Sequence, residues 1–297
     1  MFKKILRQYY KFIAIPLAYQ KTKALRILNS MDSIQYIIDK KCSVSRFGDG
    51  EFDVLLGRDG NTFQTANEKL AERLREVLTS TDVPNHMVGI PYPMKDTTRL
   101  RKTSKNFWDF YTLRNKDQLL PYLSSELTYL DTQLSRFYII YEQKNHCRKQ
   151  LDLLRQIWNG RDIVIVEGEQ SRTGVGNDLY ANAKSIQRIL GLTTNAFEKY
   201  DDMLDAITAN VTKDKLILLS YGMCATVLAY DLAKLGYWAI DIGHLDNEYE
   251  WMKMGATDNV PIKGKFTNEG GEEGRTNIEE CKDEAYLSQI ICNINQQ

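Results

Sequence analysis

The stretch "KLILLSYGMCATVLAYDLAKLGYWAIDIG", residues 215–243, decides the fold. It opens with a strand pattern at 215–222 around the unbroken apolar run "LILL", continues with small and apolar residues in a helical pattern at 224–235, and closes with a second strand pattern at 237–243. Continuous apolar runs are typical of strands that helices cover on both faces, as in parallel sheets. The stretch therefore predicts a strand, a crossover helix and a second parallel strand.

The same alternation of apolar runs and helical patterns extends over most of the chain. Further strands are predicted at 42–47, 86–90, 136–141 and 162–168. Further helices are predicted at 66–78, 145–158, 178–190 and 201–210. Strands that alternate with helices in this way indicate a Rossmann-like α/β fold with a mostly parallel sheet and helices on both faces.

The composition is that of an ordinary soluble globular protein. The 297 residues include 39 Lys and Arg and 39 Asp and Glu, so bulk charge gives no attraction to a polyanion and no nucleic-acid partner is expected. The five cysteines are an odd number without a C-x-x-C pair. This pattern favours reduced thiols in a cytoplasmic protein over a disulfide framework or a zinc site.

The two ends of the chain differ from the middle. Residues 1–40 are predicted to form a basic N-terminal helical segment, because seven Lys and Arg and no acid occur in the first 26 residues. The apolar run "FIAIPLAY" at 12–19 is too short to span a bilayer. Packing on the domain and peripheral contact with anionic lipid at the inner face of the membrane both stay open. Residues 41–297 are predicted to form a single domain with an acidic loop at 268–280 and a C-terminal helix.

Polar clusters follow several predicted strands, where α/β sheets bind their ligands. The first is "RFGDGEF" at 46–52, in which Asp49 and Glu51 flank a glycine after the strand and Gly48 allows close backbone approach. Two such carboxylates can converge on a hard divalent cation, and Arg46 can pair with a carboxylate or a phosphate. A plain Asp-Gly turn explains the same letters without a metal.

The second cluster is "VEGEQSRTGVGNDL" at 166–179, which supplies Ser171, Arg172, Gly176 and Asn177. If a helix begins near Asn177, its first amide groups and the arginine form a cradle for an anion such as a diphosphate. An N-cap role for Asn177 is compatible with that site. Gly222 adds a further phosphate-binding position, because a strand is followed directly by a helix there and the first amides of the helix can bind a phosphate.

The third cluster is "AIDIGHLDNEYEWM" at 239–252, which contains His244, Asp246 and Glu248. The histidine is open to three interpretations: metal ligand, general base or hydrogen-bonded structural residue. Either carboxylate can act as a general base toward a sugar hydroxyl. Together the clusters predict a site for a nucleoside diphosphate with a bound divalent metal.

These three motifs, in this order, resemble the GT-D glycosyltransferase family over about 43–269. The resemblance implies a Rossmann-like GT-D fold and transfer of a hexose, typically glucose, from a UDP-sugar to a glycan acceptor on a protein or lipid carrier. It further implies Mn²⁺ at a D-x-E motif, here Asp49 and Glu51, with Mg²⁺ chemically close. By the same resemblance Ser171, Arg172 and Asn177 contact the nucleotide, and His244, Asp246 and Glu248 lie near the sugar.

One departure from the family pattern concerns the donor. The family usually has Gly-Pro-Thr-Ala after the fifth strand, and this chain has Gly222-Met223-Cys224-Ala225. The missing hydroxyl leaves the donor preference open. Two other functions also stay open on the sequence: a metal-dependent nucleotide-sugar hydrolase, and a non-catalytic nucleotide-sugar-binding component of a glycan-assembly complex.

Overall fold

The computed structural model describes residues 2–60, 63–276 and 278–296. Within them, nine strands form one sheet in the order β1-β4-β3-β2-β8-β7-β5-β6-β9, and every paired strand is parallel to its neighbour. The strands are β1 Arg26–Ile27, β2 Ser43–Arg46, β3 His86–Ile90, β4 Thr128–Asp131, β5 Asp162–Gly168, β6 Ser185–Gly191, β7 Leu216–Ser220, β8 Trp238–Asp241 and β9 Ile290–Asn293. The predicted α/β fold with a parallel sheet is confirmed.

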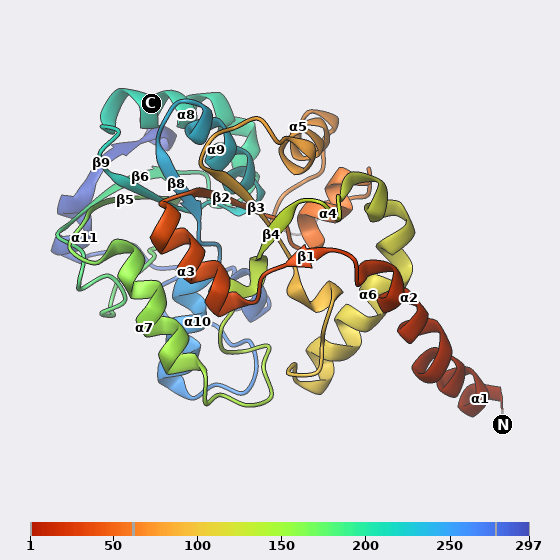
Figure 1. Ribbon diagram of the computed structural model, residues 1–297. Coiled ribbons are helices and arrows are strands. Elements are labelled where there is room, and N and C mark those ends of the chain that lie inside the picture. Colours follow the sequence, from red (N-terminus) through yellow and green to blue (C-terminus); the bar gives the residue numbers. More distant parts are fainter. Residues whose placement is uncertain (1, 61–62, 277, 297) are drawn as a thin grey trace.

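Helices cover both faces of this sheet (Figure 1). They are α1 Phe2–Tyr9, α2 Ile15–Thr22, α3 Ser30–Lys40, α4 Asp49–Leu55, α5 Glu68–Thr79, α6 Lys102–Leu119, α7 Cys147–Trp158, α8 Tyr200–Asn210, α9 Gly222–Lys234, α10 Leu245–Met254 and α11 Glu284–Gln289. A π-helical turn, η1 Tyr10–Ala14, joins α1 to α2, and short 3₁₀ turns include η4 Thr132–Ser135 and η6 Asn268–Gly270. In Figure 1, α8 and α9 lie on one side of the sheet, and α3, α7 and α10 lie on the other.

The central strands explain why their apolar sequence pattern predicts them correctly. In β5 and β7 the apolar runs are buried without interruption, from Ile163 to Val166 and from Leu216 to Leu219. The two strands pair directly, with Val166 beside Leu219. Helix α9 packs on β2 and β8, so the stretch 215–243 builds the strand, helix and strand that its sequence predicts.

Two predicted elements are wrong. The segment 136–141 is not a strand, and β4 comes earlier, at Thr128–Asp131. The segment 178–190 is not a helix: it forms turns and then β6. Strand β6 pairs with β5 over its whole length, and this buried pairing overrides the helical propensity of its polar residues.

Residues 2–22 lie partly outside the body of the domain. Helix α1 projects away from the body, whereas α2 packs against α6 (Figure 1). The chain then enters the body, because β1 pairs with β4 and α3 packs on α7. No helix among the described residues has the length and hydropathy that crossing a bilayer requires.

Candidate active site

A cavity of about 550 Å³ opens at the carboxyl edge of the sheet. Residues after β2, β5, β7 and β8 line it, as ligand-binding residues of α/β sheets commonly do. Among the residues predicted from the sequence, those that line the cavity are Arg46, Gly48, Asp49, Glu51, Ser171, Gly222, His244 and Asp246. The topology therefore brings together side chains that lie up to 200 positions apart (246 minus 46) in the chain.

The "GDGE" sequence is the first turn of a helix rather than a free turn. Asp49 and Glu51 both lie in the first turn of α4, and the Glu51 carboxylate accepts a hydrogen bond of 2.7 Å from the Gly48 amide. This contact satisfies an amide that the helix itself leaves unpaired. The positive end of the helix dipole also favours negative charge here, which explains two carboxylates in sequence.

The two carboxylates differ in their partners. Among the described residues, no donor from another residue bonds or pairs with the Asp49 carboxylate, although this side chain is open to the cavity. Enclosure by protein raises the pKa of Asp49, and burial with nearby Asp241 and Asp49 raises the pKa of Glu51 to about 7. Such a site is short of positive charge, and a divalent cation would supply it.

The residues present therefore fit a hard cation with an open coordination sphere. Two carboxylates provide oxygen ligands of the kind that Mn²⁺ and Mg²⁺ prefer. The described residues contain no group of three or more His, Cys, Asp or Glu side chains arranged to hold a metal. Other ligands would have to come from substrate phosphates and water, as is usual for Mg²⁺ with nucleotides.

Arg46 is fixed at the cavity wall by three bonds. Its guanidinium donates to the Thr132 carbonyl (3.0 Å), to the Ser135 hydroxyl (2.7 Å) and to Asp241 (3.0 Å). Gly243 makes room for it: its φ is +46°, and a Cβ atom there would lie 1.7 Å from an Arg46 nitrogen. The arginine thus presents a rigid positive charge at the same edge as the carboxylates.

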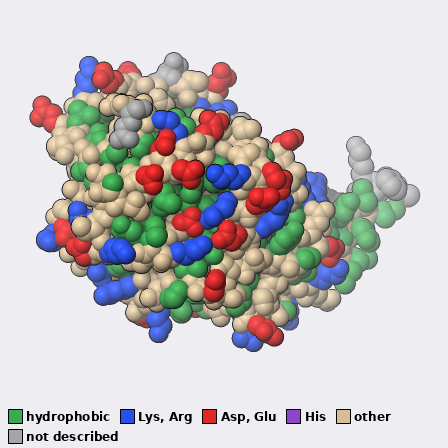
Figure 2. All heavy atoms as spheres, turned by 90° about the horizontal axis from the view of Figure 1, so that it is seen from above, with side chains coloured by type: hydrophobic (Ala, Val, Ile, Leu, Met, Phe, Trp, Pro, Cys, Tyr) green, Lys and Arg blue, Asp and Glu red, His purple; other side chains and the backbone are tan. Residues whose placement is uncertain are grey.

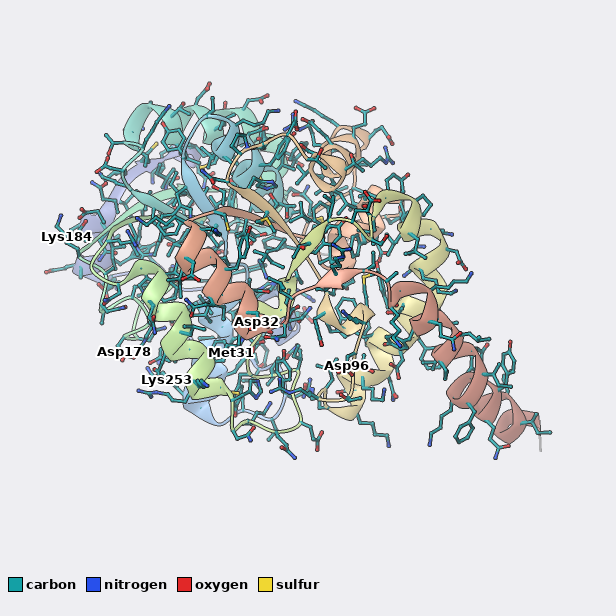
Figure 3. The ribbon with its side chains drawn as sticks, in the orientation of Figure 1. Met31, Asp32, Asp96, Asp178, Lys184 and Lys253 are labelled. Atoms are coloured by element: carbon teal, nitrogen blue, oxygen red, sulfur yellow. The ribbon has the colours of Figure 1, made fainter. Side chains whose placement is uncertain are left out.

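The second predicted cluster is arranged differently from expectation, because no helix begins near Asn177. Ser171 lines the cavity, but Arg172 donates to the carbonyls of Gly264 (2.6 Å) and Glu279 (2.5 Å). Asp178, the predicted helix start, lies at the surface near α7 (Figure 3) and pairs with Arg155 at 3.3 Å.

The amide cradle predicted for this cluster is therefore absent from the described turns after β5. Asn177 instead donates to the carboxylates of Asp246 (2.7 Å) and Glu250 (2.5 Å), and it does not line the cavity. Gly176 has a φ of +75° within these turns and also lies outside the cavity lining. The nucleotide contacts proposed for Arg172, Gly176 and Asn177 stay predictions that this geometry does not favour.

The third cluster holds three groups in different environments. His244 lines the cavity, and 38 % of its side chain is exposed there. Protein atoms enclose the rest of the ring, and the resulting loss of solvation lowers the pKa of His244. Asp246 is held between Asn177 and Lys265, whose ammonium lies 2.6 Å away. Glu248 is fully buried and accepts the backbone amides of Tyr138 and Ile139 at 2.7 and 2.9 Å.

Two residues that sequence reasoning missed complete the site. Arg136 makes a two-point ion pair with Glu269, at 2.5 and 3.0 Å, and both line the cavity. The pair connects η6 to the segment that carries Arg136, and His244 lies 4.0 Å from the same glutamate. Arg136 lies in the segment 136–141 that the sequence predicts as a strand, so no signal indicated a site residue there. Glu269 lies in the predicted acidic loop at 268–280, and the concentration of acids was the signal that could have found it.

The fold and the cavity define a class: α/β proteins that bind a ligand at the carboxyl edge of a parallel sheet, here with carboxylates, an arginine and a histidine facing it. The chain belongs to the GT-D glycosyltransferase family, since the family described as "Glycosyltransferase GT-D fold" matches residues 44–270. The resemblance inferred from the sequence motifs is thereby confirmed.

Relatives and solved structures agree with this assignment. The chain is 36% identical over 281 residues to a probable glycosyl transferase, Gly, of Streptococcus gordonii, and 34% identical over 297 residues to the glycosyltransferase GlyD of Streptococcus pneumoniae. It covers 40% and 35% of the length of these two relatives, and they match 95% and 98% of this chain.

The solved structures match nearly end to end. A structure described as domain of unknown function 1792 with a distinct glycosyltransferase fold is 36% identical, with a TM-score of 0.87, covering 94% of this chain and 99% of the other. A glycosyltransferase of the same domain from Streptococcus sanguinis is also 36% identical, with a TM-score of 0.85. It covers 91% of this chain and 99% of its own.

Proposed function

We propose that this chain is a metal-dependent glycosyltransferase that moves a hexose, with glucose as the expected sugar, from a UDP-sugar to a glycan acceptor. The observation that carries the proposal is the Asp49 carboxylate. It faces a cavity large enough for a nucleotide sugar and has no protein partner among the described residues. Membership of the GT-D family supports the reaction class.

Asp49 and Glu51 would hold the cation, Mn²⁺ or Mg²⁺. When bound, it would neutralise the negative charge that develops on the leaving diphosphate. Arg46 supports the same step, because its guanidinium is fixed by neighbours before any ligand binds and need not reorganise. Ser171 and the start of α9 at Gly222 add polar groups to the cavity lining.

His244 is the group best suited to accept the proton of the acceptor hydroxyl. It is the one of the three predicted catalytic residues that combines exposure to the cavity with a lowered pKa, so its ring is neutral near pH 7. Asp246 is engaged by Lys265, and Glu248 is buried against backbone amides. We therefore assign the base to His244 and positioning roles to the two acids.

Calorimetric titration of UDP and UDP-glucose, with and without Mn²⁺, tests the proposal on the wild type and on Asp49→Asn. We expect metal-dependent binding that the variant loses by tenfold or more, because the amide removes the charge without changing the shape. Asp53→Asn is the matched control: it alters another carboxylate of α4, one that pairs with Arg58 instead of facing the cavity. Equal metal-dependent binding by wild type and Asp49→Asn would refute the assignment.

A second measurement separates transfer from hydrolysis. The release of UDP from UDP-glucose is followed with and without a glycan acceptor, at saturating metal. We expect the acceptor to accelerate release, since a transferase completes its reaction on that hydroxyl. Release at one rate in both conditions would favour the nucleotide-sugar hydrolase instead.

A further inference from the structure

The N-terminal arm, defined here as residues 5–22 of α1, η1 and α2, presents an unusual apolar surface. Its large exposed side chains are Ile5, Leu6, Tyr9, Phe12, Ile13 and Leu17. Their spacing repeats every three to four residues, as on one side of a helix. Figure 2 shows hydrophobic side chains gathered on this projecting end of the molecule. In the described part of α1 and η1, no residue is buried by the body.

The arm and the residues next to it, up to Arg26, carry charge of a single sign. The first 26 residues contain seven Lys and Arg and no Asp or Glu, although the chain as a whole has equal numbers of both. Lys11, Lys23 and Arg26 are exposed among the described residues. An amphipathic helix with aromatic and aliphatic groups beside basic residues has the composition of helices that lie in a membrane interface.

The arm is anchored firmly to the body. Tyr19 donates hydrogen bonds to the Asp109 carboxylate (2.9 Å) and the Pro93 carbonyl (3.1 Å), and Thr22 donates to the Met94 carbonyl (2.6 Å). These hydrogen bonds, and not only the continuity of the chain, fix the orientation of α2 relative to the body.

Helix α6 continues the apolar surface and reaches the cavity. Tyr10 of the arm packs edge-on against Phe110, which is itself exposed, with ring centroids 5.6 Å apart. Phe107 is 47 % exposed and also lines the cavity, together with Trp108 and Ser104. One helix thus joins the apolar arm to the wall of the candidate active site.

We propose that the arm and the exposed face of α6 dock on an anionic lipid surface, with the apolar side chains inserted at the headgroup level. The excess of basic residues complements the negative charge of such a surface. A symmetric contact between two copies would bring these same cations together, which disfavours self-association. Docking through α6 would set the mouth of the cavity close to the membrane, where a membrane-bound acceptor could reach it.

Flotation of the full chain with vesicles tests the proposal. Vesicles of pure phosphatidylcholine are compared with vesicles that contain 30% phosphatidylserine, at low and high salt. We expect binding to the anionic vesicles alone, weakened by salt. Phe12→Ser should weaken it tenfold or more, because a large apolar side chain leaves the interface. Lys11→Glu with Lys23→Glu should weaken it at least twentyfold, at about fivefold for each cation lost.

Matched controls make the same kinds of change far from the arm. Leu235→Ser removes an exposed apolar side chain after α9, and Lys253→Glu reverses a charge on α10, away from the arm (Figure 3). Both should bind like the wild type. Loss of binding in these controls, or no binding of the wild type, overturns the proposal. So does a dimer in sedimentation without lipid that Phe12→Ser converts to monomer. UDP titration of the same samples reports the donor site separately.

Discussion

Glu248→Gln distinguishes a catalytic carboxylate from a structural one. Glu248 is completely buried in α10, and one of its oxygens accepts the amides of Tyr138 and Ile139 at 2.7 and 2.9 Å. Its other oxygen lies 3.9 Å from the Arg136 side chain. Burial raises the pKa of Glu248, whereas Arg136 and the two amides act in the opposite direction. The residue therefore anchors the segment that carries Arg136 into the cavity.

The magnitude follows from these contacts. A glutamine keeps the shape but turns two charge-assisted hydrogen bonds into neutral ones, at a cost of about 1 kcal/mol each. The glutamine also lacks the negative charge that faces Arg136 in the wild type. Removing a buried charge recovers part of the lost stability. We expect the free energy of unfolding to fall by about 1–3 kcal/mol and Tm to fall by roughly 2–5 °C, since a chain of this length has a large entropy of unfolding.

Urea unfolding and initial-rate kinetics are measured on the same samples. Glu248→Gln should lower stability and reduce kcat less than tenfold, whereas His244→Gln should reduce kcat by about 10²-fold or more with little change in stability. Glu142→Gln, at an exposed position, is the control for the substitution itself. The reasoning fails if Glu248→Gln keeps full stability and loses activity as His244→Gln does, because Glu248 would then be the base.

Two further predictions concern groups outside the reaction. The Ser45 hydroxyl donates to the Thr226 carbonyl (2.6 Å), so His86 must donate to that oxygen (2.8 Å), and burial lowers the pKa of His86 to about 4. Because the folded state disfavours the protonated ring, the contribution of His86 to the free energy of unfolding is complete above pH 6.5. It falls by about 3 kcal/mol as the pH drops from 6.5 to 4. Urea unfolding should show that His86→Gln lacks this fall. Arg172→Met should free the carbonyls of Gly264 and Glu279 from the guanidinium, and limited proteolysis next to these two residues should become faster; an unchanged cleavage rate would contradict the anchoring role.

The central sheet could be predicted because its information is local. Strands β5 and β7 are short apolar runs that need no partner to be recognised, and every residue from Ile163 to Val166 is buried. The errors lie where distant partners decide the structure. In β6, Arg188 would be exposed in a helix, but it is buried by an ion pair of 2.6 Å with Glu167 and by the ring of Tyr286.

The segment 136–141 shows the opposite error. Its aromatic and β-branched residues predict a strand, yet its amides bond to the Glu248 side chain more than 100 residues away. Because a buried carboxylate satisfies these amides, the segment does not need a neighbouring strand. The true fourth strand, β4, has only four residues and gives too weak a pattern to be recognised.

In the candidate site, too, local sequence predicts some features and distant contacts determine the others. Parallel strands end at one edge, so residues placed just after a strand could be assigned to the cavity from chain order, correctly for Asp49, Gly222 and His244 but not for Gly176 and Asn177. What each side chain does there depends on its partners, and these are non-local: Arg136 and Glu269 are 133 positions apart. The motifs contain two arginines, Arg46 and Arg172, and both donate to backbone carbonyls. Only the folded structure shows that Arg46 lines the cavity and Arg172 does not. Sequence order therefore predicts which edge of the sheet carries the candidate site, and the buried ion pairs determine which of its side chains are open to a ligand.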